Sequence, residues 1–471
     1  LVPPYRPCRP SLRQHLAIQE GWFVLLVTAW IFEFAARFKL VRWLTAAAFL
    51  ARAHYFRACG RYFRALMDFC WIARVSRVPQ LERVAKRFID DAIAVARDSP
   101  LNPIVVGYLA DPASASCARL FTVSGTGSLD IFRDVIVLKA ATTSEKGVIL
   151  LKYARTFEAV QAIFDVPKLL ERYTFVLEPC WAGYCDPSLL MFVAQAHPVL
   201  VQCFTKQDSD FIRQVGPPLV PLDLGPADWV DADLFKPERD RNKTHDLVMV
   251  ANWAKHKRHS LLFRAIERVR GRDVSVLLIG FPLAGRVMAD VKREAASIVN
   301  RGIRVDFLER IPARSVAGHV SGCRAFVFLS RKEGDNKALV EAMFADVPSI
   351  VYKHTVGGAS RRINEATGML VEDADLPAAI VSVLDDPHRF SPRAWALANT
   401  GSRIATRVVD DALRRAAFGQ GQPYTTSIVE KTNAPNLAYR DEADRARFAA
   451  DYAFIHECRR MTAPLAPAGR V

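Results

Sequence analysis

The amino-acid sequence predicts an α/β fold with two doubly wound domains behind a helical N-terminal region. Its 471 residues are too many for one compact core, which makes two domains the expectation. Short apolar runs alternate with helix-length segments, a pattern typical of parallel sheets covered by helices. A proline-rich segment at 216–221 separates two sets of these runs. Ligands of such sheets bind at the carboxyl ends of the strands, so functional residues are expected there.

Residues 1–100 are predicted to form a helical extension, because glycine and proline are scarce between about 14 and 96. Residues 1–67 contain ten arginines or lysines against two glutamates, a net charge of +8. Near the middle of the extension, basic and apolar side chains are predicted on opposite faces of one helix: Arg57, Arg61 and Arg64 against Tyr55, Cys59, Tyr62 and Leu66. Such a helix fits either an anionic membrane surface, contacted through residues 15–70, or a helical layer packed on the next domain.

The apolar run at 22–32 is too short to span a bilayer, and no small-residue cleavage site follows it. The nine cysteines include no C-x-x-C pair, which fits a reducing compartment and gives no zinc site. A cytoplasmic protein, peripheral at the inner membrane face, is therefore expected. The net charge of +15 favours polyanionic partners, but no zinc-finger or RNP-like pattern indicates a nucleic-acid binder.

The apolar runs predict strands in two domains. A first domain over 101–222 is predicted to contain strands at 104–109, 135–138, 148–151, 175–177 and 199–201. A second domain over 223–390 is predicted to contain strands at 247–250, 274–279, 305–308, 326–329 and 350–352. Residues 391–471 are expected to form a C-terminal helical tail, interrupted around 419–423, that packs back on the first domain.

The most informative segment follows the strand at 326–329. A short polar loop with Gly334 leads into a helix that begins near residue 335. The unpaired N–H groups of a helix N-terminus favour an anion, Gly334 allows its close approach, and Lys337 adds a charge. Glu333 and Glu341 are acceptors for hydroxyl groups on either side of a diphosphate. The segment therefore predicts a site for a nucleotide-diphosphate sugar.

The spacing of Glu333 and Glu341, followed by Ala342-Met343 and Val347-Pro348, resembles the E-x7-E motif of the retaining family-4 glycosyltransferases. Residues 230–237 resemble the G-V-D-x-x-x-F-x-P segment of this family, and residues 367–371 resemble its T-G-x-L-V strand. These landmarks cover about residues 215–385 in family order; the alternative is a surface helix with two glutamates. The resemblance, to the type called glycosyl transferases group 1, implies the GT-B fold, in which two Rossmann-like domains face a cleft.

By this resemblance, Glu333 contacts the transferred sugar, Glu341 holds the ribose hydroxyls, and the backbone near Asn336 and Lys337 holds the distal phosphate. Gly280 ends the strand at 274–279 and lies where the family holds the base, without identifying that base.

The family also carries a V-G-R-x-x-x-x-K-G segment after the first strand of this domain, and the chain departs from it. Lys257 aligns with the family lysine, but Asn252 replaces the arginine and Arg258 replaces the glycine. Lys255 or Arg258 could supply the missing charge, and a solvated basic loop is the alternative.

The family's Gly-Gly loop is missing from the first domain, so an acceptor site is predicted there from the residues alone. Lys152 and Arg155 follow one predicted strand, and Trp181 and Tyr184 follow the next. The cations could meet an acceptor phosphate, while the aromatic rings could stack on a sugar or a prenyl chain. Packing and loop roles are the alternative.

The predicted function is transfer of a sugar from a GDP- or UDP-sugar to a polysaccharide, a glycolipid or another acceptor, with retention of configuration. Lys257, Lys337 and the helix N–H groups would stabilise the leaving diphosphate. No D-x-D motif follows a strand, so no obligatory metal or other cofactor is expected. The departure at Asn252 motivates an alternative: a catalytically silent GT-B-like scaffold or binding protein at a membrane surface.

Overall fold

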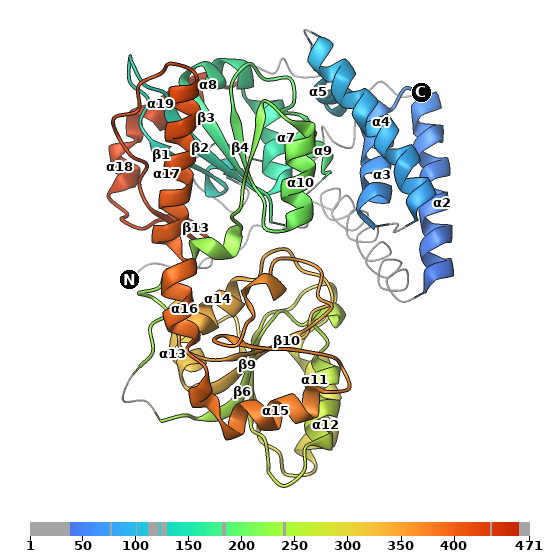
Figure 1. The fold of residues 1–471 in the computed structure, drawn as a ribbon, viewed down its shortest axis with the longest axis vertical. Coiled ribbons are helices and arrows are strands. Elements are labelled where there is room, and N and C mark those ends of the chain that lie inside the picture. Colours follow the sequence, from blue (N-terminus) through green and yellow to red (C-terminus); the bar gives the residue numbers. More distant parts are fainter. Residues whose placement is uncertain are drawn as a thin grey trace, which may run out of the picture.

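The computed structural model describes residues 38–75, 78–99, 101–111, 121, 123, 130–180, 185–238, 242–433 and 436–460. Within these ranges, a helical layer precedes two domains, each built on a sheet that helices cover (Figure 1). The predicted fold class, two Rossmann-like domains behind an N-terminal helical region, is confirmed.

The helical layer contains α2 (Lys39–Ala58), α3 (Tyr62–Val75), α4 (Pro79–Asp98) and α5 (Pro103–Ala110). The prediction of one continuous helix through residues 55–66 is wrong. Gly60 adopts a left-handed φ of +72° and separates α2 from α3. Arg57 therefore lies on α2, while Arg64 lies on α3 and forms an ion pair with Asp111 at 2.7 Å. The basic face predicted for a single helix is divided between two helices.

The strand predicted at 104–109 is also wrong, because this segment forms α5. The Asn102 side chain caps the helix by accepting a hydrogen bond from the Ile104 N–H at 3.0 Å. Pro103 occupies the first helical turn, where a missing N–H costs nothing. Ile104 and Tyr108, four residues apart, are both buried. A short apolar run fits either element, and the cap decides this one in favour of a helix.

The first sheet is formed by five strands in the order of the chain: β1 (Val135–Lys139), β2 (Gly147–Lys152), β3 (Tyr173–Glu178), β4 (Val199–Gln202) and β5 (Leu219–Leu222). β1 pairs antiparallel with β2, and the other pairs are parallel. β5 lies in the segment predicted to be a connector. It is an edge strand, the place in a sheet where a residue such as Pro221 is tolerated.

Helices cover both faces of this sheet (Figure 1). The crossover helices α7 (Ala154–Ile163), α9 (Pro187–Leu190) and α10 (Lys206–Val215) lie on the face toward the helical layer, and α8 (Val166–Arg172) precedes β3. The other face is covered by α17 (Ser402–Gly419), α18 (Asp444–Arg447) and α19 (Ala449–Glu457). The Tyr173 hydroxyl donates to the Asp451 carboxylate at 2.8 Å and fixes α19 on β3.

The second sheet has six parallel strands in the order β11-β10-β9-β6-β7-β8. They are β6 (His245–Val250), β7 (Val276–Gly280), β8 (Val305–Glu309), β9 (Cys323–Phe328), β10 (Ser349–Tyr352) and β11 (Gly368–Val371). This is the strand order of Rossmann folds, with its switch point between β6 and β9. Every strand predicted in this domain is confirmed. The covering helices are α11 (His259–Arg268), α12 (Met288–Val299), α13 (Ala313–Ser321), α14 (Lys337–Phe344) and α15 (Leu376–Asp385).

The chain returns to the first domain along one side of the molecule, where α16 (Pro392–Asn399) and α17 run nearly in line (Figure 1). A hairpin of β12 (Lys431–Asn433) and β13 (Leu437–Tyr439), which the sequence did not predict, follows α17. Among the described residues, no helix is long and apolar enough to cross a membrane.

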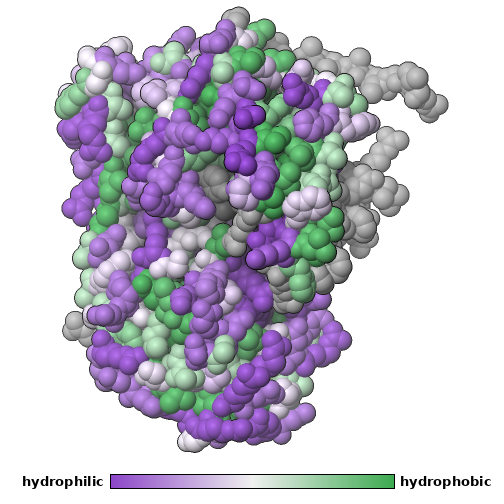
Figure 2. Space-filling model, turned by 45° about the vertical axis from the view of Figure 1, so that its right-hand side comes forward, coloured by the Kyte–Doolittle hydropathy of each residue, from purple (hydrophilic) through white to green (hydrophobic). Residues whose placement is uncertain are grey.

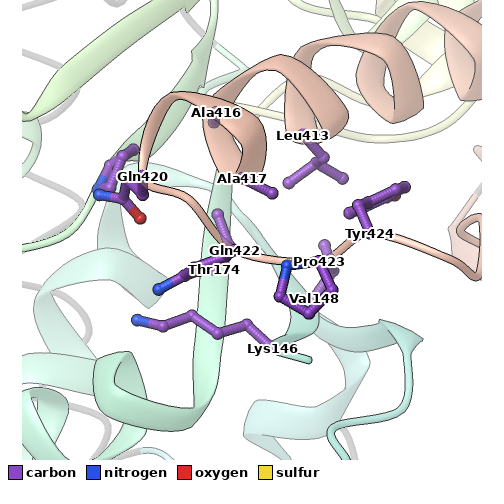
Figure 3. Close-up of a pocket in the computed structure, with 11 residues that line it drawn as sticks. Lys146, Val148, Thr174, Leu413, Ala416, Ala417, Gln420, Gln422, Pro423 and Tyr424 are labelled. Atoms are coloured by element: carbon purple, nitrogen blue, oxygen red, sulfur yellow. The ribbon is translucent and has the colours of Figure 1, made fainter. Parts of the chain in front are cut away.

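A small pocket lies at the amino ends of β2, β3 and β4, between them and α17 (Figure 3). Its lining includes Lys146, Thr174, Leu413 and Tyr424, and its volume of about 20 Å³ leaves room for roughly one water molecule. Ligands of parallel sheets bind at the carboxyl ends of strands, so this pocket is at the wrong end to be the functional site.

Candidate functional site

The centre of the candidate site is the loop between β9 and α14, at the switch point of the second sheet. Asn336 caps α14, because its side-chain oxygen accepts a hydrogen bond from the Leu339 N–H at 2.9 Å. The remaining first-turn N–H groups make this helix end suited to an anion. A small 3-10 helix, η3 (Lys255–Lys257), follows the neighbouring strand β6 and reaches the same place.

The structure brings together the two residues predicted to be catalytic. Lys257 Nζ forms an ion pair with Glu333 Oε1, and the Ser330 hydroxyl donates to the same oxygen at 2.8 Å. The lysine and glutamate side chains are only 8% and 14% exposed. Their carboxylate and ammonium groups are therefore held in one orientation and largely shielded from water. Ser330 is a positioning residue for Glu333 that the sequence did not single out.

A glycine-rich loop at 356–358 packs against the loop that carries Glu333. The Glu333 N–H donates to the Val356 carbonyl, and the Gly358 N–H donates to the Gly334 carbonyl, both at 2.9 Å. A Cβ added to Gly357, whose φ is +134°, would lie 2.4 Å from the carbonyl oxygens of Glu333 and Gly334. Only glycine permits this approach, so the two loops have a single mutual arrangement.

Four charged side chains form a group, here called the junction cluster: buried Asp228, Asp335 and Arg362, and the more exposed Arg361. Arg362 forms ion pairs with both carboxylates, at 2.9 Å to Asp335 Oδ2 and 2.8 Å to Asp228 Oδ1. Burial opposes ionisation of Asp228, but Arg362 and Arg361 hold the pKa of that carboxyl below its usual value. The cluster therefore fixes the position of Asp335, the residue that follows Gly334 in the chain.

The junction cluster is also bonded to the linker between the domains. Asp228 belongs to η2 (Pro226–Trp229), and Asp335 Oδ2 accepts a hydrogen bond from the Ala227 N–H at 3.0 Å. No spacing in the sequence indicated these contacts, since Asp228 and Arg362 are far apart in the chain.

Glu341 and Lys337 lie on the side of α14 that faces the first domain. Burial raises the pKa of Glu341 to about 7, although Lys337 opposes this shift. Burial lowers the pKa of Lys337, and the nearby charge of Lys152 in the first domain lowers it further. Both residues are thus enclosed at the junction of the two domains.

The basic loop after β6 distributes its charges unevenly. Asn252 accepts a hydrogen bond from the Ala254 N–H at 3.1 Å, which shapes the turn, while Lys255 is exposed. Arg258 forms an ion pair with Asp373 and donates to the Leu329 carbonyl at 3.2 Å. These contacts engage its guanidinium, so Arg258 is not proposed as the source of the missing phosphate-binding charge. Lys255 is the better candidate for that role.

Gly280 permits close packing at the end of β7. A Cβ at this position would lie 2.2 Å from the Ala251 carbonyl oxygen and 2.8 Å from the Trp253 ring. The glycine is therefore required by the packing of its neighbours.

The residues predicted to contact the acceptor substrate in the first domain differ in their environments. Lys152 is almost fully buried: its Nζ donates to Asn433 Oδ1 at 2.8 Å and lies 3.7 Å from Glu178 Oε1. Lys431 of the β12 hairpin donates from its Nζ to the other oxygen of this carboxylate, Glu178 Oε2, at 2.5 Å. Lys152 therefore neutralises an internal carboxylate and is not proposed as an acceptor contact. The hairpin that encloses it was absent from the sequence prediction.

Arg155 remains exposed, with 65% of its side chain accessible and Asp134 at 3.5 Å. Trp181 and Tyr184 lie outside the described residues. In the described part of the chain, no group of three or more His, Cys, Asp or Glu side chains is arranged to hold a metal ion.

The GT-B class of fold consists of two Rossmann-like domains joined by a helix that returns to the first domain. This chain has that arrangement, and the N-terminus of α14, which suits an anion, lies at the junction of the domains. The family described as Glycosyl transferases group 1 matches residues 244–386, which extend over the second domain from β6 through α15. No curated protein that was compared with the chain matches it.

Several solved structures are similar to the chain. Sucrose-phosphate synthase from Thermosynechococcus elongatus is 18% identical with a TM-score of 0.46, over 58% of this chain and 74% of that one. HepE of Anabaena in complex with UDP is 17% identical with a TM-score of 0.45, over 56% and 78%. The C-terminal domain of a glycosyl transferase group 1 family protein from Francisella tularensis is 18% identical with a TM-score of 0.32, over 36% and 97%.

Proposed function

We propose that this protein is a retaining glycosyltransferase of the family-4 type, which moves a sugar from a GDP- or UDP-sugar to a polysaccharide, glycolipid or other acceptor. The observation that carries the proposal is the ion pair of Lys257 and Glu333 beside the N-terminus of α14, at the switch point of a group 1 domain. A nucleotide-diphosphate sugar has a hydroxyl-rich end and an anionic centre, and this arrangement offers an acceptor for the first and positive groups for the second.

The chemistry proposed for the site is stabilisation of a leaving nucleoside diphosphate. Negative charge grows on the diphosphate as the bond from the anomeric carbon breaks, so cations fixed beforehand at that place lower the barrier. Lys257 and the first-turn N–H groups of α14 would supply positive charge, and Lys337 would add to it. Glu333 would accept hydrogen bonds from the sugar hydroxyls. Retention of configuration is proposed from the family resemblance.

A panel of nucleotide sugars tests the donor site by thermal unfolding. The matching donor is expected to raise the melting temperature, because a ligand at about 100 times its Kd stabilises the folded state by roughly 2.7 kcal/mol. Glu341→Ala is expected to lose most of this shift, since the buried carboxylate is the proposed acceptor for the ribose hydroxyls. Glu365→Ala, at an exposed position, is the control and should keep the full shift. If no nucleotide sugar shifts the melting temperature, the donor-site proposal fails.

We also propose that the helical layer contacts an anionic membrane surface. Leu40, Trp43 and Leu44 lie on one face of α2 and are 69%, 48% and 53% exposed. The side of the molecule that contains this layer shows apolar patches between hydrophilic ones (Figure 2). Lys39 and Arg57 on α2 are exposed as well. Apolar groups beside cations suit the boundary between acyl chains and anionic headgroups.

Sedimentation with vesicles tests this contact. Binding to phosphatidylglycerol vesicles is expected to exceed binding to phosphatidylcholine vesicles and to weaken as salt is added. The double variant Trp43→Ser, Leu44→Ser should lose most of the binding. Phe418→Ser, which changes an equally exposed side chain on α17, should leave it unchanged. Equal losses in both variants, or equal binding to both lipids, would contradict the proposed surface.

A further inference from the structure

The carboxyl ends of β7 and β8 lie side by side, and the proposed function assigns no role to the side chains there. Gly280 pairs with Glu309 across the two strands, and the Arg310 N–H donates to the Gly280 carbonyl at 3.0 Å. This inference rests on the proposed function and on the family resemblance behind it, which implies that the base of the donor lies at these strand ends. Glu309 is therefore in reach of the edge of that base.

The Glu309 carboxylate is fixed in direction by a buried tryptophan. Trp253 Nε1 donates to Glu309 Oε2 at 2.7 Å, and the fully buried Trp253 ring packs where a Gly280 Cβ would otherwise lie. The indole cannot turn within this packing, so it holds one carboxylate oxygen and leaves the other to point elsewhere. The side chain itself is partly exposed.

No salt bridge to a described residue offsets the charge of this carboxylate. Among the described residues, no lysine, arginine or histidine forms an ion pair with Glu309, and its bond from Trp253 is the one hydrogen bond that its side chain makes. A partly buried carboxylate with a spare oxygen is a strong acceptor for N–H donors of a ligand.

We propose that Glu309 selects guanine as the base of the donor, so that the substrate is a GDP-sugar. Guanine presents two adjacent donors, N1–H and N2–H: the spare oxygen of Glu309 accepts from one, and Oε2, which has a second lone pair beside its bond from Trp253, accepts from the other. Uracil presents one N–H between two carbonyl oxygens, and these oxygens face a negative charge at this position. A site built to accept hydrogen bonds rejects a ligand that cannot supply them. A preference of about 10- to 100-fold for GDP over UDP is expected from one such two-donor contact.

Titration calorimetry with GDP, UDP, ADP and CDP tests the proposal on the full chain. GDP is expected to bind most tightly, by at least about 10-fold over UDP. Tightest binding of UDP, ADP or CDP, or equal binding of GDP and UDP, overturns the selection of guanine while the proposed glycosyltransferase function stands. Binding of none of the four overturns both.

The variant Glu309→Gln separates base selection from a structural role. Its amide oxygen can still accept the Trp253 hydrogen bond, so its melting temperature should match that of the unchanged protein. Its NH₂ group replaces the spare acceptor by a donor, so GDP affinity should fall about 10-fold or more while UDP affinity does not fall. Equal losses for GDP and UDP, or unchanged GDP affinity, overturn the proposal. Glu365→Gln, at an exposed position, is the control for a general charge effect.

Discussion

Replacing Lys257 by alanine is expected to lower the kcat for nucleoside diphosphate release from the matching donor by about 100- to 1000-fold. Loss of one preorganised group that stabilises developing negative charge has an effect of this size in other enzymes. Lys257 is 8% exposed and is held by Glu333, so its position is set before the substrate arrives. Slow transfer of the sugar to water gives a readout that needs no knowledge of the acceptor.

The control for this experiment is Lys292→Ala, which removes an exposed lysine from α12 in the same domain. It should leave kcat within about two-fold of the unchanged protein, as is usual for surface positions away from a site. A Lys257→Ala protein that binds donor and releases product normally would refute the proposed role of the lysine. Donor binding without any release in the unchanged protein would favour a catalytically silent binding protein.

Replacing Arg362 by methionine is expected to lower the free energy of unfolding by about 3–5 kcal/mol. Removing one partner of a buried ionic group leaves uncompensated charge in the interior, which costs about this much. Here the loss would leave Asp228 and Asp335 buried near each other, each 8% exposed or less. Burial disfavours the charged form of Arg362, yet both carboxylates hold its pKa above its already high value, so the charge is retained in the folded state.

Arg361→Met is the matched control, because it removes the neighbouring arginine of the same cluster. The Arg361 side chain is 33% exposed, and Asp228 would keep Arg362, the Thr400 hydroxyl at 2.6 Å and the Gly225 N–H at 2.8 Å. A loss of about 1 kcal/mol or less is therefore expected. Denaturant unfolding followed by tryptophan fluorescence compares the two variants. Equal losses would show that the buried position of Arg362 has no special importance.

The second domain could be predicted well because its information is local. Each of its strands is an apolar run with turn residues on both sides, and its site residues follow directly after strands. Glu333 and Lys257 meet because β9 and β6 are neighbours at the switch point, as the strand order of such domains requires. Sequence patterns indicate such positions when the fold itself brings adjacent strand ends together.

The first domain and its borders were predicted less well, for physical reasons that specific residues illustrate. The apolar run of α5 fits a strand or a helix equally, and a single cap at Asn102 decides between them. Lys152 is the last residue of β2, at the strand end as expected, but Asn433 and Lys431 from a distant hairpin enclose it. Contacts between segments so far apart in the chain leave no periodic signal, and the junction cluster escaped prediction for the same reason.

The short helix η2 is bonded to both domains at once. On one side, Asp228 binds Arg362 and Thr400. On the other, Trp229 Nε1 donates to Gln202 Oε1 at 3.0 Å, and Asn433 donates to the Pro226 carbonyl at 3.0 Å. A rotation of one domain against the other about this linker would break buried hydrogen bonds, each costing about 1–3 kcal/mol when left unmade. The linker therefore holds the two domains in one relative orientation. That orientation sets the angle at which a donor and an acceptor would meet.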